Sequence, residues 1–139
     1  MRVVLDTNVL VSALIERGGP PALLIDAWLN GRFTLVTGFA QLDEFARVTR
    51  YPKIQKRITR SEAGRLINDL RSLAAQVKPA RRISASKDPD DNVLLGLAVA
   101  AKAEWLVTGD KAGLLSLLRF RQVRIVTARR LCEELSLLR

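Results

Sequence analysis

Short apolar runs rich in β-branched residues alternate along the chain with longer segments in which apolar residues recur at helical spacing. The short runs predict strands at residues 3–5, 33–36, 105–107 and 123–126. Because parallel neighbouring strands need a crossover connection, this alternation predicts a parallel β-sheet with helices on both faces. The predicted fold class is therefore α/β.

The helical segments between these strands are equally regular. Helices are predicted over residues 9–15, 21–31, 38–48, 93–101 and 114–118, and a last helix has Leu131, Cys132, Leu135 and Leu138 on one stripe. The segment over 93–101 is apolar on nearly every face, which is typical of a buried helix. An α/β core needs such a helix against its sheet.

Capping residues locate the starts of two helices. Thr37 is the expected N-cap of the helix over 38–48, whose apolar stripe consists of Phe39, Leu42, Phe45 and Ala46. A further amphipathic helix has its apolar residues spaced from Leu66 to Val77. Its start has two competing signals, because Ser61 is one possible cap and Thr59 with Glu62 forms a possible capping box.

Composition points to one packed domain. With 139 residues, 48% of them hydrophobic, we expect residues 1–139 to form a single domain. The single cysteine, Cys132, can form no internal disulfide, which favours a reducing, cytoplasmic setting with Cys132 in the core. No apolar run has the length that a transmembrane helix needs, so we expect no membrane association.

The charge balance favours polyanionic partners. Lys and Arg number 23 against 14 Asp and Glu, which gives a formal net charge of +9. A field of this sign attracts nucleic acid, although an Arg-rich surface that serves only solubility is the alternative. Charge alone does not decide between the two.

Histidine is absent, and this excludes several classes of enzyme. The chain has no imidazole for general acid-base catalysis, for activating a Ser or Cys nucleophile, or for a zinc site built on His. A ribonuclease that uses paired histidines is excluded as well. Hard oxygen ligands remain, so the expected chemistry depends on carboxylates.

Acidic residues follow two predicted strands and precede the buried helix. Asp6 and Asp110 each come directly after a strand, and in parallel sheets ligands bind at that edge. Gathered carboxylates repel one another, and Mg²⁺ or Mn²⁺ relieves that repulsion and supports phosphodiester hydrolysis. Taken singly, Asp6, Asp88 and Asp91 could each be a cap or turn residue.

Three motifs resemble those of PIN-domain proteins. They are residues 3–10 (VVLDTNVL), 88–92 (DPDDN) ahead of an apolar helix, and 106–110 (LVTGD). The chain is most similar to VapC-type toxins of toxin-antitoxin modules. The resemblance implies a three-layer α/β/α domain with a central parallel sheet, a Mg²⁺- or Mn²⁺-dependent endoribonuclease activity, an antitoxin partner and a homodimer.

The resemblance also implies roles for individual residues. Asp6, Glu44, Asp91 and Asp110 are the expected catalytic acids and metal ligands. Asn8 and Thr108 are supporting polar groups. Asp88 and Asp90 are possible substitutes for Asp91, and Asp88 is otherwise a supporting residue.

Glu44 is the acid on which helical periodicity and the resemblance disagree. It lies roughly opposite the stripe of Phe39, Leu42 and Phe45, so periodicity alone predicts a solvated side chain. It also shares a row with Ala40 and Val48, which leaves room for a second, partly buried face. The neighbouring Asp43 is the rival candidate.

A basic segment follows the third predicted helix. It contains Arg47, Arg50, Lys53, Lys56, Arg57, Arg60 and Arg65, and the only acid among them is Glu62. We expect Arg50, Lys53, Lys56 and Arg57 to contact RNA phosphates, with Tyr51 as the only aromatic residue for stacking. A solvated face is the alternative.

Two other functional classes are compatible with acids at strand ends. A phospho-acceptor domain needs a lysine near its aspartate, and the candidates Lys87 and Lys111 do not end a strand. A PIN fold that binds RNA or an antitoxin without cleaving RNA is the second alternative. The intact set of acids argues for an enzyme.

Overall fold

The computed structural model describes residues 1–138. Its strands are β1 (Arg2–Leu5), β2 (Thr34–Thr37), β3 (Ala75–Gln76), β4 (Trp105–Val107), β5 (Arg119–Phe120) and β6 (Val123–Val126). Its helices are α1 (Thr7–Ile15), α2 (Pro20–Leu29), α3 (Phe39–Val48), α4 (Pro52–Gln55), α5 (Arg60–Leu73), α6 (Pro89–Ala100) and α7 (Ala128–Glu134), with a 3₁₀ helix, η1, over Leu114–Leu117. None of these helices is both long enough and apolar enough to cross a bilayer.

The strands form one sheet in the order β3-β2-β1-β4-β6-β5. Every neighbouring pair is parallel apart from β5 and β6, which form an antiparallel hairpin at the edge. The predicted α/β class with a central parallel sheet is confirmed. The antiparallel edge strand was not predicted, because a strand of two residues has no measurable alternation of polar and apolar positions.

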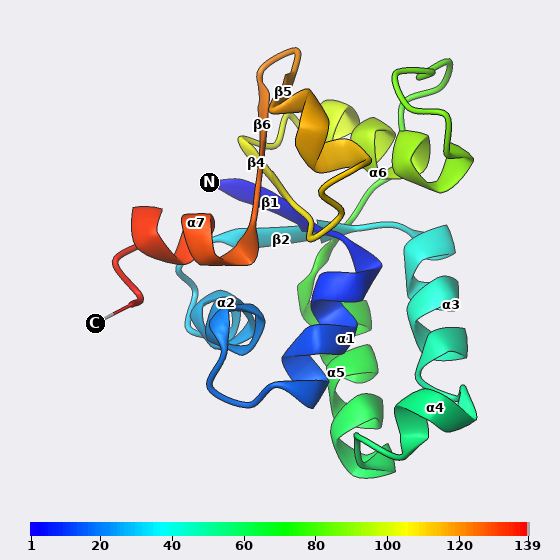
Figure 1. Cartoon of the computed structure of the whole chain (residues 1–139), viewed down its shortest axis with the longest axis vertical. Helices are drawn as coiled ribbons and strands as arrows, with labels where there is room; N and C mark the ends of the chain where they lie inside the picture. The colour runs from blue at the N-terminus through cyan, green and yellow to red at the C-terminus, as the bar shows by residue number, and fades with distance from the viewer. Residues whose placement is uncertain (139) are drawn as a thin grey trace.

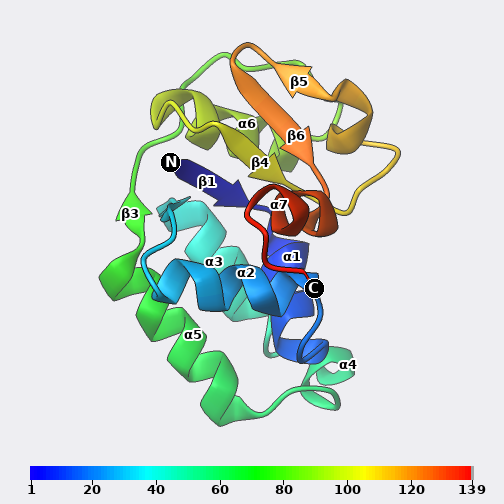
Figure 2. The same cartoon turned by 90° about the vertical axis from the view of Figure 1, so that its left-hand side faces the viewer.

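Helices cover both faces of the sheet and make three layers (Figures 1 and 2). Alternate residues of β1 point to opposite faces, as the pleat requires. Val3 and Leu5 pack against α1, α2, α3, α5 and α7, whereas Val4 packs against α6 and η1. Each layer therefore has its own apolar core.

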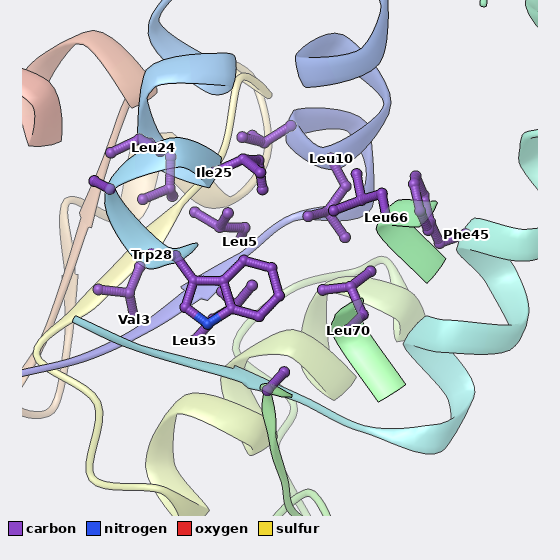
Figure 3. Close-up of a cluster of buried hydrophobic side chains, with 14 of the residues drawn as sticks. Val3, Leu5, Leu10, Leu24, Ile25, Trp28, Leu35, Phe45, Leu66 and Leu70 are labelled. Carbon is purple, nitrogen blue, oxygen red and sulfur yellow. The ribbon is translucent and has the colours of Figure 1, made fainter. Parts of the chain in front are cut away.

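The larger core lies beneath the first three strands (Figure 3). Trp28 of α2 and Phe45 of α3 are its bulkiest buried side chains, and Leu70 of α5 is fully buried beside them. Cys132 is fully buried in the same core, and this burial raises the pKa of its thiol. The prediction that Cys132 is a core residue is confirmed.

Several local predictions need correction. Thr37 does not cap α3: it ends β2, and the N-cap is Gly38, which has no side chain to accept a hydrogen bond. Phe39 is 82% exposed and does not belong to the buried stripe of α3. The stripe is rotated because Gln41 is buried and its amide nitrogen donates to the carbonyl oxygen of Leu5 at the end of β1.

Two helix ends also differ from prediction. The amphipathic helix α5 ends at Leu73, so Val77 lies beyond it and after β3, whose backbone pairs with β2. The last helix, α7, ends at Glu134, and Leu138 packs against the core from the segment that follows. Of the two capping signals for α5, the capping box is confirmed, because the Thr59 hydroxyl accepts from the Glu62 backbone N–H at 3.1 Å.

Strand order places two acids at one point of the sheet. The chain forms β2 and β3 on one side of β1 and then returns to place β4 on the other side, so that the connections diverge between β1 and β4. The crevice at such a switch point is the usual ligand site of an open α/β sheet. Asp6 follows β1 and Asp110 follows β4, and the Asp6 N–H donates to the Val107 carbonyl at 2.8 Å.

Candidate active site

An acidic cleft of about 410 Å³ opens at this edge of the sheet. Five carboxylates line it, and they are Asp6, Glu44, Asp88, Asp90 and Asp91. They come from the end of β1, from α3 and from the first turn of α6 with its cap. The fold thus brings together acids that lie far apart in the sequence.

Asp6 is held by two donors. Its Oδ2 accepts a hydrogen bond of 2.8 Å from the Thr108 hydroxyl, and its Oδ1 accepts one of 3.4 Å from the Asn8 backbone N–H at the start of α1. The interpretation of Asp6 as a helix cap is therefore correct as well. A capping carboxylate that also faces a cleft of other acids has both a structural and a chemical role.

Burial and neighbouring charge work against ionisation of Asp6. Burial raises the pKa of its carboxyl, and the charges of Asp91 and Glu44 raise it further. The hydrogen bonds from Thr108 and from the Asn8 backbone lower the pKa, but they do not outweigh the burial. An anion at this position is costly unless a cation compensates it.

Asp91 is buried in the first turn of α6. Its Oδ2 accepts a hydrogen bond of 2.9 Å from the Ser86 hydroxyl. Burial raises its pKa, and Asp88, Asp110 and Asp90 raise it further, against the lowering effect of Ser86. Asp91 does not cap α6, because Asp88 is the N-cap and accepts from the Asp90 backbone N–H at 2.9 Å.

Glu44 lies in the cleft, where helical periodicity alone did not place it. Its side chain is half-buried and lines the acidic cleft, whereas Asp43 is exposed and is not part of the lining. The physical reason is the buried Gln41, one turn earlier on the same face, which accepts from the Thr37 hydroxyl at 2.8 Å. This polar face turns α3 so that Glu44 points toward Asp6.

Asp110 stands at the rim of the site. It is exposed and does not line the acidic cleft, although it is close enough for its charge to raise the pKa of Asp91. Its Oδ1 accepts from the Gly113 N–H at 3.0 Å, and its own N–H donates to the Thr108 hydroxyl oxygen at 3.1 Å. Thr108 therefore connects the two acids that follow β1 and β4.

The acids do not form a ready-made ligand shell. Within residues 1–138, no three acidic side chains converge closely enough to hold an ion as they stand. The donor set nevertheless fits a hard divalent cation, because it offers only anionic oxygens and their mutual repulsion is uncompensated. An ion would draw these carboxylates together and remove the repulsion that raises the pKa of Asp6 and of Asp91.

Comparison with known proteins agrees with this arrangement. The family model described as PIN domain matches residues 2–112. The chain belongs to the PIN domain family. It is also 30% identical to the uncharacterized protein MJ1680 of Methanocaldococcus jannaschii, over 112 residues that are 80% of this chain and 72% of that protein. PIN domains are usually nucleases, and PIN-domain nucleases generally use divalent metals.

Cations border the acids of this PIN domain. Arg47 and the exposed ring of Tyr51 line the acidic cleft itself. Arg50 lines a separate groove between the end of α3 and the start of α5, and the exposed Lys53, Lys56 and Arg57 line neither. Glu62 forms an ion pair with Arg17, from the connection between α1 and α2, and so does not neutralise the basic segment.

Sequence reasoning missed two polar residues of the PIN domain's site. Gln41 and Ser86 lie outside the three motifs, and nothing in their spacing distinguishes them from solvated residues. A buried glutamine on an otherwise amphipathic helix is visible only in three dimensions. Ser86 lies in a connection that has no periodic pattern, six residues before its hydrogen-bonding partner Asn92.

Proposed function

We propose that this protein is a divalent-metal-dependent endoribonuclease that hydrolyses RNA phosphodiester bonds. The observation that carries the proposal is the meeting of Asp6, Glu44 and Asp91 in one cleft from three different elements. The absence of histidine supports a metal-based mechanism over one based on imidazole. The surplus of nine positive charges favours a polyanionic substrate.

Asp6, Glu44, Asp91 and Asp110 are the residues that would hold Mg²⁺ or Mn²⁺. Such an ion supplies a water of lowered pKa and neutralises charge on the scissile phosphate. Thr108 orients the Asp6 carboxylate, and Ser86 orients that of Asp91, through the hydrogen bonds described above. Arg47 supplies a fixed cation at the wall of the cleft for an adjoining phosphate.

The ends of the cleaved RNA test this mechanism. We expect EDTA to abolish cleavage and Mn²⁺ or Mg²⁺ to restore it, with products that have a 5′-phosphate and a 3′-hydroxyl, because the attacking group is a water. End-labelling and mass spectrometry of the products measure this directly. Cyclic phosphate ends, or cleavage that persists in EDTA, would refute the mechanism, and binding without any cleavage would favour the alternative of an RNA- or antitoxin-binding module.

We further propose that the protein is the cytoplasmic toxin of a toxin-antitoxin module, paired with an antitoxin and acting as a homodimer. This proposal rests on the similarity of its three motifs to those of VapC-type toxins. Induced expression without a partner should arrest growth, and Asp6→Asn should relieve the arrest. Colony counts after induction measure both, and equal arrest by the two forms would indicate overexpression stress instead.

A further inference from the structure

The connection between β3 and α6 contains a second basic segment. Residues 78–87, which we call the basic loop, contain Lys78, Arg81, Arg82 and Lys87 and no acid. All four side chains are exposed, and no ion pair among residues 1–138 includes any of them. This is a local charge of +4 beside a cleft lined by five acids.

The basic loop is anchored to α6 at two points. Near its start, the Ala80 N–H donates to the Gly96 carbonyl at 3.0 Å. Near its end, the Ser86 N–H donates to Asn92 Oδ1 and the Asn92 amide nitrogen donates to the Ser86 carbonyl, both at 2.9 Å. Its cations are therefore carried on an ordered segment.

Glycine at position 96 makes the first anchor possible. A Cβ on Gly96 would lie 2.7 Å from the Ala80 carbonyl oxygen and 3.0 Å from Pro79 Cβ, so any larger residue would push the loop away. The buried helix α6 thus carries both the acid Asp91 and the contact that positions the basic loop. The relative position of acids and cations is built into this one helix.

The basic loop and the acidic cleft share a wall. Lys78, Arg81 and Arg82 line a groove with Val93 of α6, and Val93 also lines the acidic cleft. The loop lies beside the start of α6 on the same side of the molecule as α3 and α4, which border the cleft from below (Figure 1). Cations therefore border the acids on two sides, with Arg47 on α3 and the basic loop on α6.

We propose that the basic loop binds the phosphate backbone of single-stranded RNA and leads the strand across α6 into the acidic cleft; this deepens the function proposed above and rests on it. A strand that enters a cleft of five acids needs cations next to the cleft to offset the repulsion. The cleft, at about 410 Å³, is far too small for a duplex, whose major groove alone is about 12 Å wide. The loop contains no aromatic residue, so its contacts are to phosphates and independent of sequence.

The salt dependence of RNA binding tests the proposal. A fluorescently labelled single-stranded RNA is titrated in EDTA, which keeps it uncut, and its Kd is measured by anisotropy over a range of salt concentrations. Arg81→Gln with Arg82→Gln should weaken binding and make the slope of log K against log salt shallower by about 1.4, at about 0.7 for each phosphate that the variant no longer neutralises on a single strand. Arg71→Gln with Arg119→Gln is the matched control, because these two exposed arginines lie in α5 and β5 and line neither groove.

A second variant moves the loop without changing its charge. Gly96→Ala should weaken RNA binding because the loop must shift away from α6, and a thermal unfolding curve checks that the variant is folded. Should it fail to fold, the exposed arginine pair decides the question by itself. Neither arginine belongs to the acid cluster, so both loop variants keep the metal-binding residues.

The outcomes separate this inference from the nuclease proposal. A shallower slope in the Arg81 and Arg82 variant alone supports the basic loop, even if Mn²⁺ fails to produce cleavage and the nuclease proposal fails. Cleavage by the wild type together with an unchanged slope in that variant overturns the basic loop and leaves the nuclease. An equal change in the control variant, tighter binding of duplex DNA than of single-stranded RNA, or no RNA binding at all overturns the inference.

Discussion

Asp6→Asn is expected to abolish RNA cleavage and to leave the protein folded and at least as stable as the wild type. The substitution keeps the shape of the side chain, and an asparagine oxygen can still cap α1 and accept from the Thr108 hydroxyl. It removes the anionic ligand at the centre of the cluster. Because changes in the residues around metal ligands already cost about 10- to 100-fold, we expect activity to fall by at least about 100-fold.

The stability part of this expectation follows from the pKa of Asp6. Burial raises the pKa of Asp6 above its ordinary value of 3.8, so the folded protein holds this proton more tightly than the unfolded chain does. The free energy of unfolding therefore falls as the pH rises from that ordinary value through the raised one, and the whole penalty is present at neutral pH. Asparagine has no charge to bury and escapes the penalty.

Thermal unfolding in EDTA and in Mn²⁺ measures both effects. In EDTA at neutral pH, Asp6→Asn should unfold at the same temperature as the wild type or above it. Adding Mn²⁺ should raise the unfolding temperature of the wild type, since a ligand that binds only the folded state stabilises it, and should raise that of Asp6→Asn much less. Asp26→Asn, an exposed acid of α2 outside the cleft, is the control for charge alone. A variant that keeps both its activity and its response to Mn²⁺ would remove Asp6 from the site.

Glu44→Gln is expected to lower cleavage by about 10- to 100-fold and to raise the Mn²⁺ concentration needed for half-maximal activity. Glutamine keeps the size of the side chain and loses the charge that a divalent ion attracts. The half-buried Glu44 lines the same cleft as Asp6, and its charge contributes to the raised pKa of Asp6. Its loss therefore weakens the acid cluster directly, with little effect on packing.

Asp43→Asn is the matched control for this prediction. Asp43 is the next residue toward the N-terminus, carries the same charge and is exposed outside the cleft. Its substitution should leave both the rate and the Mn²⁺ requirement close to those of the wild type. If Asp43→Asn shifted the metal requirement and Glu44→Gln did not, the functional face of α3 would be rotated by one residue, about 100°, from the face that contains Glu44.

The course of the chain could be predicted where residue pattern and backbone requirement coincide. The buried strands β1, β4 and β6 are short apolar runs, and parallel neighbours require helical crossovers between them. Thr59 and Glu62 indicate the start of α5 because a helix N-terminus needs acceptors for its free N–H groups. The two-residue strands β3 and β5 could not be predicted, because their pairing depends on neighbours from elsewhere in the chain.

By itself, the sequence determined the α/β class, the oxygen-only chemistry of a chain without histidine, and the positions of Asp6 and Asp110 after strands. Each of these depends on residue type and on contacts with near neighbours in the chain. The tertiary structure alone decided that Glu44 and not Asp43 faces the cleft, since a buried Gln41 bonded to the end of β1 sets the rotation of α3. It also decided that the basic loop lies against α6, because only a glycine at position 96 lets the two backbones approach so closely. Contacts between segments far apart in the sequence fix such rotations and approaches, and no local pattern encodes them.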